Sequence, residues 1–377
     1  MTFRETLSRF SNNVQYTLFP DLETRLGPLS LDYRRVVTVL ELVRIEEFLS
    51  CTRFCLGRPS KDRAFIARAF IAKILLKIPH TKQLILALQR DRQLREICGW
   101  EAYSKIPSAA KFSRAFQEFT NQLLPEKVHQ TLISNVLEDK MIGHLVKDST
   151  PLIAREKPKR KKGSSKKRKR EADRRYELEK AGKKLSRRQK QLDHQSLEEM
   201  LQDLPKDCDI GAKKNAQGLL QIWNGYKLHV AIGDHCLPIA AILTSASLND
   251  CEVGIPLAEK ANQVVQNFYD LMDSAYDIEE IKEHSRRLGH VSIIDRHSRS
   301  KAQKAEKLEK QLAAKTLSYY TAEEKRYKER MPKERFNATF KDFYGGRGIF
   351  YKGHAKVFCH VMFGIVALTA TTLIGFL

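Results

Sequence analysis

The sequence predicts a mixed α/β domain built around one sheet (residues 140–377), preceded by an all-helical domain (residues 1–139). In the first part, apolar residues recur every three or four positions, which is the period of an amphipathic helix. From Lys140 onward, short apolar runs alternate with helical patterns, as they do in α/β folds. Two of these runs end in an aspartate, Asp148 and Asp273, and open α/β sheets place functional residues at such strand ends.

The helical part contains two long periodic segments and a shorter basic one. Residues 62–77 (DRAFIARAFIAKILLK) and 82–97 (KQLILALQRDRQLREI) are each expected to form one helix. A further helix is expected to begin after Ser108 as its N-cap, with Lys111 and Arg114 on its first turns. Short helices that end in a basic one are typical of a helix-turn-helix reader of duplex DNA. We therefore expect a DNA-binding domain, although a helical packing domain with a solvated basic face fits the same residues equally well.

The second part predicts strands and helices in alternation. The expected elements are a strand at residues 142–146, strands at 218–231 and 237–244, a helix from Asp250 to residue 266, a strand at 268–272, a helix near 278–288 and a strand at 291–294. Gly233-Asp234 is expected to form the turn of a hairpin, and Asn249 or Asp250 is expected to cap the helix that follows. Lys227 and His229 alternate along one strand, so one of them could face DNA, but a structural role is at least as consistent.

The charge of the chain points to a polyanionic partner. Lys and Arg number 67 against 45 Asp and Glu, a formal net charge of +22, and such an excess favours nucleic acid through phosphate contacts and counterion release. The basic arm (residues 155–190) holds 19 Lys and Arg against 5 Asp and Glu, so it carries +14 of that charge. Its core, residues 157–170 (KPKRKKGSSKKRKR), has no apolar residue except proline and cannot pack. We expect a basic, partly disordered insertion at residues 154–216 that follows phosphates or is merely solvated; a targeting signal fits the same letters.

Two features bear on the compartment. The seven cysteines show no disulfide or zinc pattern, and the N-terminal stretch MTFRETLSRF has no apolar signal core, so we expect a reducing cytoplasm. Residues 357–377 are apolar and long enough to span a membrane. Because they include His360 and several threonines, and because the sequence has no other hydrophobic span, we interpret them as a buried helix.

Three carboxylates are candidates for a divalent-metal site: Asp148, Asp273 and Glu334. Oxygen ligands suit hard divalent cations, and cleavage of a phosphodiester by two metal ions needs carboxylates that hold ions about 3.5–4 Å apart. A short side chain on a strand is held rigidly, whereas a glutamate can reach the site from a neighbouring helix. Aspartates at strand ends are also common as turn formers and helix caps, and Asp295 competes with Glu334 as the third carboxylate.

The run that contains Glu334 adds groups able to bind DNA. On one continuous helix, Tyr327, Arg330, Glu334 and Lys341 would fall within roughly 60° of one another at about 100° per residue. One carboxylate would then share a helix face with three groups that bind phosphate or stack on a base. Pro332 could instead begin a helix, in which case the tyrosine and Arg330 would precede it.

The spacing Tyr327-x2-Arg330-x3-Glu334-x6-Lys341 resembles the YREK signature of bacterial insertion-sequence DDE transposases. Further stretches resemble that family in the same order: KDSTPL at Asp148, WNGYKLHV from Trp223, LPIAAILTSASLND ending at Asp250, DSAYD from Asp273, and YKGHAKVFCHVMF near the C-terminus. Together they cover most of residues 140–377. The basic arm has no counterpart in this resemblance.

The resemblance implies a ribonuclease-H-like catalytic domain of the retroviral-integrase-like superfamily. It implies that Asp148, Asp273 and Glu334 bind two Mg²⁺ ions, for which Mn²⁺ would substitute. It further implies that Tyr327, Arg330 and Lys341 contact the transposon-end strand near the cut.

The function expected from these features is DNA transposition. Metal-dependent hydrolysis would expose a 3′-hydroxyl at the element end, and this hydroxyl would attack target DNA. The expected partners are double-stranded DNA, as transposon ends and target, and further copies of the chain in a dimer or larger DNA complex, at the nucleoid of a bacterial cytoplasm and without a membrane. Two alternatives are a nuclease of the same fold without strand transfer and an inactive DNA-binding regulator, against which the complete acidic triad counts.

Overall fold

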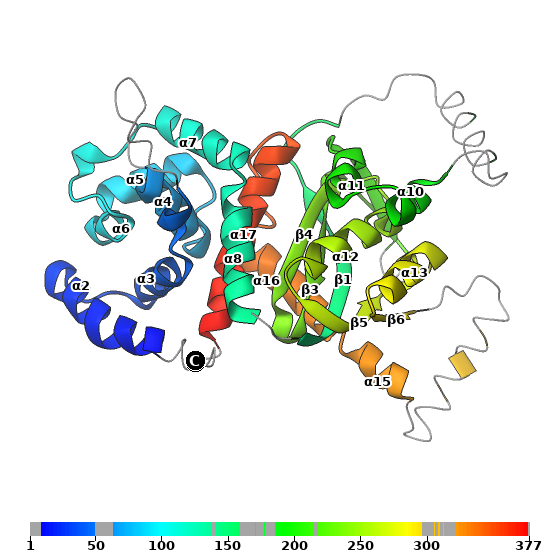
Figure 1. Ribbon diagram of the computed structural model, residues 1–377. Coiled ribbons are helices and arrows are strands. Elements are labelled where there is room, and N and C mark those ends of the chain that lie inside the picture. The colour runs from blue at the N-terminus through cyan, green and yellow to red at the C-terminus, as the bar shows by residue number, and fades with distance from the viewer. Residues whose placement is uncertain are drawn as a thin grey trace. The chain divides into compact units, whose positions relative to one another are not determined.

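The structure is a computed structural model that describes residues 9–49, 63–137, 141–158, 170, 177, 185–214, 218–295, 305, 308–309, 312 and 321–375 (Figure 1). Contacts divide the chain into two units. The helical unit comprises Met1–Glu138, Ile153–Arg155 and Asn337–Leu377, and the sheet unit comprises Asp139–Leu152 and Glu156–Phe336. The break near residue 139 falls where the sequence changes period. Residues Asn337–Leu377, which we expected in the second domain, are grouped with the helical unit instead.

The helical unit consists of short helices and one long one. Its elements are the π-helical segment η1 (Val14–Leu18), α2 (Phe19–Leu26), α3 (Leu31–Val43), η2 (Ile45–Phe48), α4 (Arg63–Leu75), α5 (Thr81–Arg90), α6 (Arg92–Cys98), η3 (Tyr103–Lys105), α7 (Ala109–Asn121), α8 (Leu124–Leu137) and α17 (His354–Ile374). The helix expected at residues 62–77 is α4. The single helix expected at 82–97 is two helices, because the Asp91 side chain accepts the Leu94 amide and caps a new one. Ser108 stands at the N-cap of α7 without a side-chain capping bond.

Helix α17 forms the centre of the helical unit. It packs against α8, α4, α3 and α7 (Figure 1). Phe363 lies among the rings of Phe70, Phe116 and Phe119, with its centroid 5.7 Å from that of Phe70. Gly364 permits a close approach, since a Cβ there would lie 2.3 Å from the Tyr344 carbonyl oxygen. In the described chain this helix alone is long and apolar enough to cross a membrane, but 78% of its apolar window is buried, as we expected for a core helix.

The sheet unit contains a mixed sheet, described as six strands. The strands are β1 (Met141–Ile153), β2 (Asp209–Lys214), β3 (Leu220–Ile232), β4 (Pro238–Ser245), β5 (Gln266–Met272) and β6 (Val291–Ile294). Their order is β2-β3-β1-β5-β6, and β4 also pairs with β3. Strand β5 is parallel to β1 and β6, whereas β3 is antiparallel to β2 and β4. The predicted mixed α/β class is confirmed, and the arrangement is consistent with a ribonuclease-H-like fold.

Short helices connect and cover these strands. They are α10 (Arg187–Asp193), α11 (Leu197–Asp203), η4 (Asp234–Cys236), η5 (Asp250–Val253), α12 (Gly254–Asn262), η6 (Ser274–Tyr276), α13 (Glu279–Arg287) and α15 (Ala322–Lys328), followed by α16 (Met331–Phe343), whose second half is grouped with the helical unit. Helix α12 contacts β3, β4 and β5, and α15 contacts β6.

The largest departures from the sequence prediction lie in the insertion and at β1. Residues 186–214 were expected to belong to a partly disordered insertion, but they form α10, α11 and β2. Most of the arm's core lies outside the described residues. Strand β1 continues through Asp148 to Ile153, so this aspartate lies within a strand and not at its end.

Candidate active site

Asp148 and Asp273 come from neighbouring parallel strands and face the same side of the sheet. The register pairs His144 with Tyr269 and Val146 with Leu271. Because side chains alternate along a strand, the two aspartates, each two residues beyond the last of these pairs, share a face. Burial and then the negative charge of Asp148 raise the pKa of Asp273 above its usual range. The structure therefore brings these two predicted site residues close enough to repel one another.

The segment that carries Glu334 is two helices and not one. Helix α15 ends at Lys328 and α16 begins at Met331, with Pro332 in its first turn. Tyr327 thus lies at the end of α15 and Arg330 lies in the connection, where its guanidinium donates to the Tyr327 hydroxyl and stands 4.6 Å from the ring centroid. The single helix face expected for the whole motif is wrong, because the break at residues 329–330 interrupts it.

Helix α15 is attached to the same face of the sheet. The Arg326 guanidinium lies 4.3 Å from the centroid of the Tyr269 ring. Tyr269 in turn stacks on His144, with ring centroids 5.5 Å apart. Because these rings precede the aspartates on β5 and β1, the contact directs the α15–α16 connection toward the carboxylate pair.

Lys333, and not Glu334, points at the carboxylate pair. Its Nζ lies 3.5 Å from Asp148 Oδ1, and the two side chains are only 17% and 13% exposed. Glu334, the next residue, is exposed. Within the residues that the structure describes, no group of three or more His, Cys, Asp or Glu side chains is placed to hold a metal ion. Two of the three predicted ligands are together and the third is not.

Two other predicted or competing residues lie on adjoining elements. Lys341 follows Glu334 by two turns of α16, so both project from nearly the same side of that helix. Asp295 follows β6, where its amide donates to the Met272 carbonyl oxygen at 3.4 Å.

Asp250 belongs to the site's surroundings and is not simply a helix cap. It lies inside η5, where Oδ2 accepts from the Ser149 hydroxyl at 2.7 Å and Oδ1 accepts from Lys227 Nζ at 2.9 Å. Burial raises the pKa of Asp250, but the electrostatic effects of His229 and Lys227, together with these hydrogen bonds, outweigh burial and lower it below the usual range. Ser149 follows Asp148 directly, so Asp250 fixes the strand at the residue next to the site.

Tyr276 lies beneath this group of carboxylates. It is fully buried, and its hydroxyl has no hydrogen-bond partner among the described residues. Burial, followed by the negative charges of Asp250, Asp148 and Asp273, raises its pKa well above the usual range. A neutral phenol therefore lines the underside of the site.

Lys227 and His229 have internal roles. The Lys227 ammonium, besides its ion pair with Asp250, donates to the Leu248 carbonyl oxygen at 2.7 Å. His229 is completely buried, with Nε2 2.9 Å from the Thr244 hydroxyl, and burial lowers its pKa to about 4. These contacts favour the structural interpretation of both residues over a DNA contact.

A buried ion pair supports the site from the opposite face of the sheet. Lys147 on β1 and Asp270 on β5 are 1% and 0% exposed, and their charged atoms are 3.0 Å apart. Asp270 also accepts from the Ser285 hydroxyl at 2.8 Å and from Asn267 Nδ2 at 3.2 Å. Burial raises the pKa of Asp270, but the Lys147 charge and its hydrogen bonds hold it far below the usual range.

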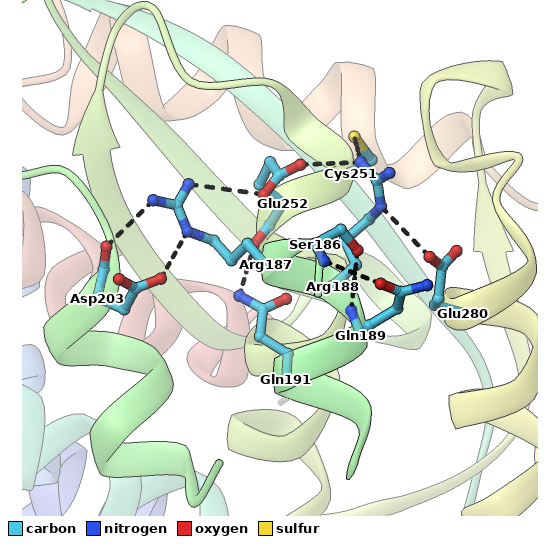
Figure 2. Close-up of polar contacts among 9 residues, drawn as sticks. All are labelled: Ser186, Arg187, Arg188, Gln189, Gln191, Asp203, Cys251, Glu252 and Glu280. Carbon is cyan, nitrogen blue, oxygen red and sulfur yellow. Dashed lines mark hydrogen bonds and ion pairs between the residues drawn. The ribbon is translucent and has the colours of Figure 1, made fainter. Parts of the chain in front are cut away.

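The C-terminal end of the basic arm is attached to acidic protein groups. Figure 2 shows Arg187 and Arg188 of α10 directed at Glu252, with Arg188 NH1 2.8 Å from Glu252 Oε1. Arg187 also pairs with Asp203 at 2.7 Å, and Gln191 Nε2 donates to the Glu252 carbonyl oxygen at 3.0 Å. These two arginines are paired within the protein, so not all of the arm's charge is open to DNA.

Comparisons with known proteins agree with this arrangement. The family model described as "Transposase DDE domain" matches residues 209–370, which include Asp273 and Glu334 and begin after Asp148. The model "Transposase domain (DUF772)" matches residues 22–118 in the helical unit. Neither the curated proteins nor the solved structures gave a match.

The fold, the paired carboxylates and the match to the DDE transposase family together define an enzyme that cleaves and rejoins phosphodiester bonds. The chain belongs to the insertion-sequence DDE transposases, and its substrate is DNA. Enzymes of this family act with a divalent metal ion.

Proposed function

We propose that the protein cuts DNA at the ends of its element and joins the resulting 3′-hydroxyl to target DNA, with Asp148, Asp273 and Glu334 as ligands of two Mg²⁺ ions. The observation that carries the proposal is the facing pair Asp148 and Asp273, in which burial and then the charge of Asp148 raise the pKa of Asp273. A divalent cation with oxygen ligands relieves the repulsion between the two carboxylates, so this pair fits such an ion. Bound Mg²⁺ would supply Lewis acidity and an activated oxygen nucleophile.

The protein's own groups hold and orient the substrate. The paired aspartates are kept in register by the β1–β5 ladder and by the Lys147–Asp270 pair behind it. Arg330 is close enough to Asp273 for its charge to affect that carboxyl, and a guanidinium there suits a phosphate of the strand being cut. We assign strand contacts to Tyr327, Arg330 and Lys341.

The helical domain would bind the element ends. Helix α7 exposes Ser113 and Arg114 on its first turns, while Phe112 and Ala115 of the same helix are buried. A helix with one buried and one basic, exposed face is suited to a DNA groove. We further propose that two or more copies assemble on the paired ends in the bacterial nucleoid.

The test is cleavage and strand transfer on labelled DNA carrying the element's own terminal repeats. Asp148→Asn, Asp273→Asn and Glu334→Gln should each reduce Mg²⁺-dependent cleavage while end binding persists. A metal ligand supplies several kcal/mol of transition-state stabilisation, which corresponds to a loss of about a hundred- to thousandfold. Glu329→Gln is the matched control, because Glu329 is an exposed glutamate five residues before Glu334.

Each outcome has a defined meaning. Full activity of any of the three variants would remove that residue from the metal site. Cleavage by the wild-type protein without joined product would instead indicate a nuclease of the same fold.

A further inference from the structure

The observation behind this inference is that a lysine lies where a metal ion is proposed to bind. Lys333 Nζ contacts Asp148 Oδ1 at 3.5 Å, and both side chains are largely buried. Its charge, together with that of Arg330, also acts on Asp273 against the effect of burial. Two neighbouring carboxylates in a partly buried site need a compensating positive charge. Lys333 supplies such a charge to this pair.

Lys333 and Glu334 cannot both face the carboxylates in one position of the helix. Consecutive residues of an α-helix differ by about 100° in direction. With Lys333 directed at Asp148, Glu334 is exposed. A rotation of the first turn of α16 by about that angle would exchange the two side chains.

The start of α16 is suited to such a rotation. Between α15 and α16 the regular α-helical pattern stops, and the amides of Glu329 and Arg330 donate to carbonyl oxygens three residues earlier, not four. Pro332, in the first turn, has no amide hydrogen to lose when the turn moves. Helix α15 remains attached through Arg326 and Tyr269, so the connection can act as a joint.

We propose that Lys333 is a built-in counter-ion of Asp148 and Asp273 that competes with the divalent metal, and that metal binding exchanges Lys333 for Glu334. This inference rests on the proposed metal site. The ammonium carries one charge and is displaced by a doubly charged ion of better geometry. DNA phosphate offers the released ammonium a new partner, so metal and DNA should each strengthen the binding of the other.

The experiment measures Mn²⁺ binding by calorimetry on the full chain, with and without element-end DNA. Lys333→Gln should tighten Mn²⁺ binding in the absence of DNA by about five- to tenfold, the order expected when one largely buried charge interaction is removed. The effect of DNA on Mn²⁺ affinity should shrink in the same variant. Lys333→Arg, which keeps the charge, should stay near wild type.

A matched control separates local competition from general charge. Arg335→Gln removes one positive charge from an exposed residue of the same turn and should leave Mn²⁺ affinity within about twofold of wild type. Thermal melting gives a second readout: without metal, Lys333→Gln should melt below wild type, and with saturating Mn²⁺ the difference should disappear. A change that was only structural would lower melting under both conditions.

The outcomes distinguish this inference from the proposed function. If Asp148→Asn and Asp273→Asn abolish Mn²⁺ binding but Lys333→Gln leaves the affinity unchanged or weaker, the counter-ion role is overturned and the metal site stands. If the two aspartate variants bind Mn²⁺ as well as wild type, the metal site itself is wrong and both proposals fall.

Discussion

Replacing Lys147 by methionine should strongly destabilise the sheet unit, because it leaves the Asp270 carboxylate buried without its main partner. The two side chains are 1% and 0% exposed, and their charged atoms are 3.0 Å apart. Removing one partner of a buried ion pair costs about 3–5 kcal/mol, whereas neutralising both is far less costly. Lys147→Met should therefore lower the free energy of unfolding by about 4 kcal/mol, and adding Asp270→Asn should restore half of that or more, since asparagine still accepts from Ser285.

The assay is urea unfolding followed by tryptophan fluorescence. The chain has two tryptophans, and a Trp100→Phe background leaves Trp223 of β3 as the reporter of the sheet unit. A cost below about 1 kcal/mol, or a double variant as unstable as the single one, would refute the reasoning.

Two further predictions concern buried charges. Burial lowers the pKa of Lys73 to about 8 in a core site 2% exposed, and at about 1.4 kcal/mol per pKa unit the buried ammonium costs about 3 kcal/mol. Because the pKa of Lys73 is lower in the folded protein, this cost is complete below pH 8 and disappears above the pKa of the unfolded chain. Lys73→Met should therefore raise the free energy of unfolding by about 1–3 kcal/mol at pH 7 and leave it unchanged at pH 11. A lower free energy of unfolding at pH 7, measured by urea unfolding, would contradict this prediction. Asp250→Asn should lower the free energy of unfolding by about 1–3 kcal/mol, because it leaves Lys227 without its ion-pair partner. It should also weaken Mn²⁺ binding, because Ser149, next to Asp148, loses its acceptor. Unchanged stability and unchanged Mn²⁺ affinity would show that Asp250 does not support the site.

Much of the sheet could be predicted because its strands carry strong local signals. The strand expected at residues 291–294 is β6, and the hairpin expected on either side of Gly233-Asp234 is β3 and β4. Strand β2 (DIGAKK) was missed because it has almost no apolar pattern and depends on its partner. Its Gly211 pairs with Trp223, and a Cβ at the glycine would lie 2.4 Å from that indole ring. The need for a glycine at this position comes from the contact with the indole ring of the neighbouring strand and not from the local strand propensity.

The helical unit shows the same limit in the split of residues 82–97. The apolar period continues through Asp91, so periodicity predicts one helix. Asp91 ends α5 because it caps α6, and its carboxylate also accepts from the Tyr33 hydroxyl of α3. The competing contact comes from a segment far away in sequence, which a local pattern does not contain.

At the site, the sequence pattern predicted that Asp148 and Asp273 lie together, but not the direction of the helix residues. Asp148 and Asp273 follow apolar runs that pair in parallel, and this register alone sets them on one face. The face expected for Tyr327 to Lys341 required an unbroken helix, but a new helix begins at Met331, with Pro332 in its first turn. Lys333 was missed because a basic residue beside a candidate ligand is unremarkable in a chain with 67 Lys and Arg. An ion pair with Asp148 identifies it only in three dimensions.

Consecutive residues of β1 place two ion pairs on opposite faces of the sheet, and their burial decides what each can do. Lys147 and Asp270 are 1% and 0% exposed, so neither charge can leave its partner without entering apolar surroundings, and the pair fixes β1 against β5. Asp148 and Lys333 are 13% and 17% exposed, so the ammonium can be rehydrated when another cation replaces it. A permanent ion pair on one face thus holds the strand while an exchangeable one covers the carboxylates on the other. This difference is why we assign a supporting role to Lys147 and a competing one to Lys333.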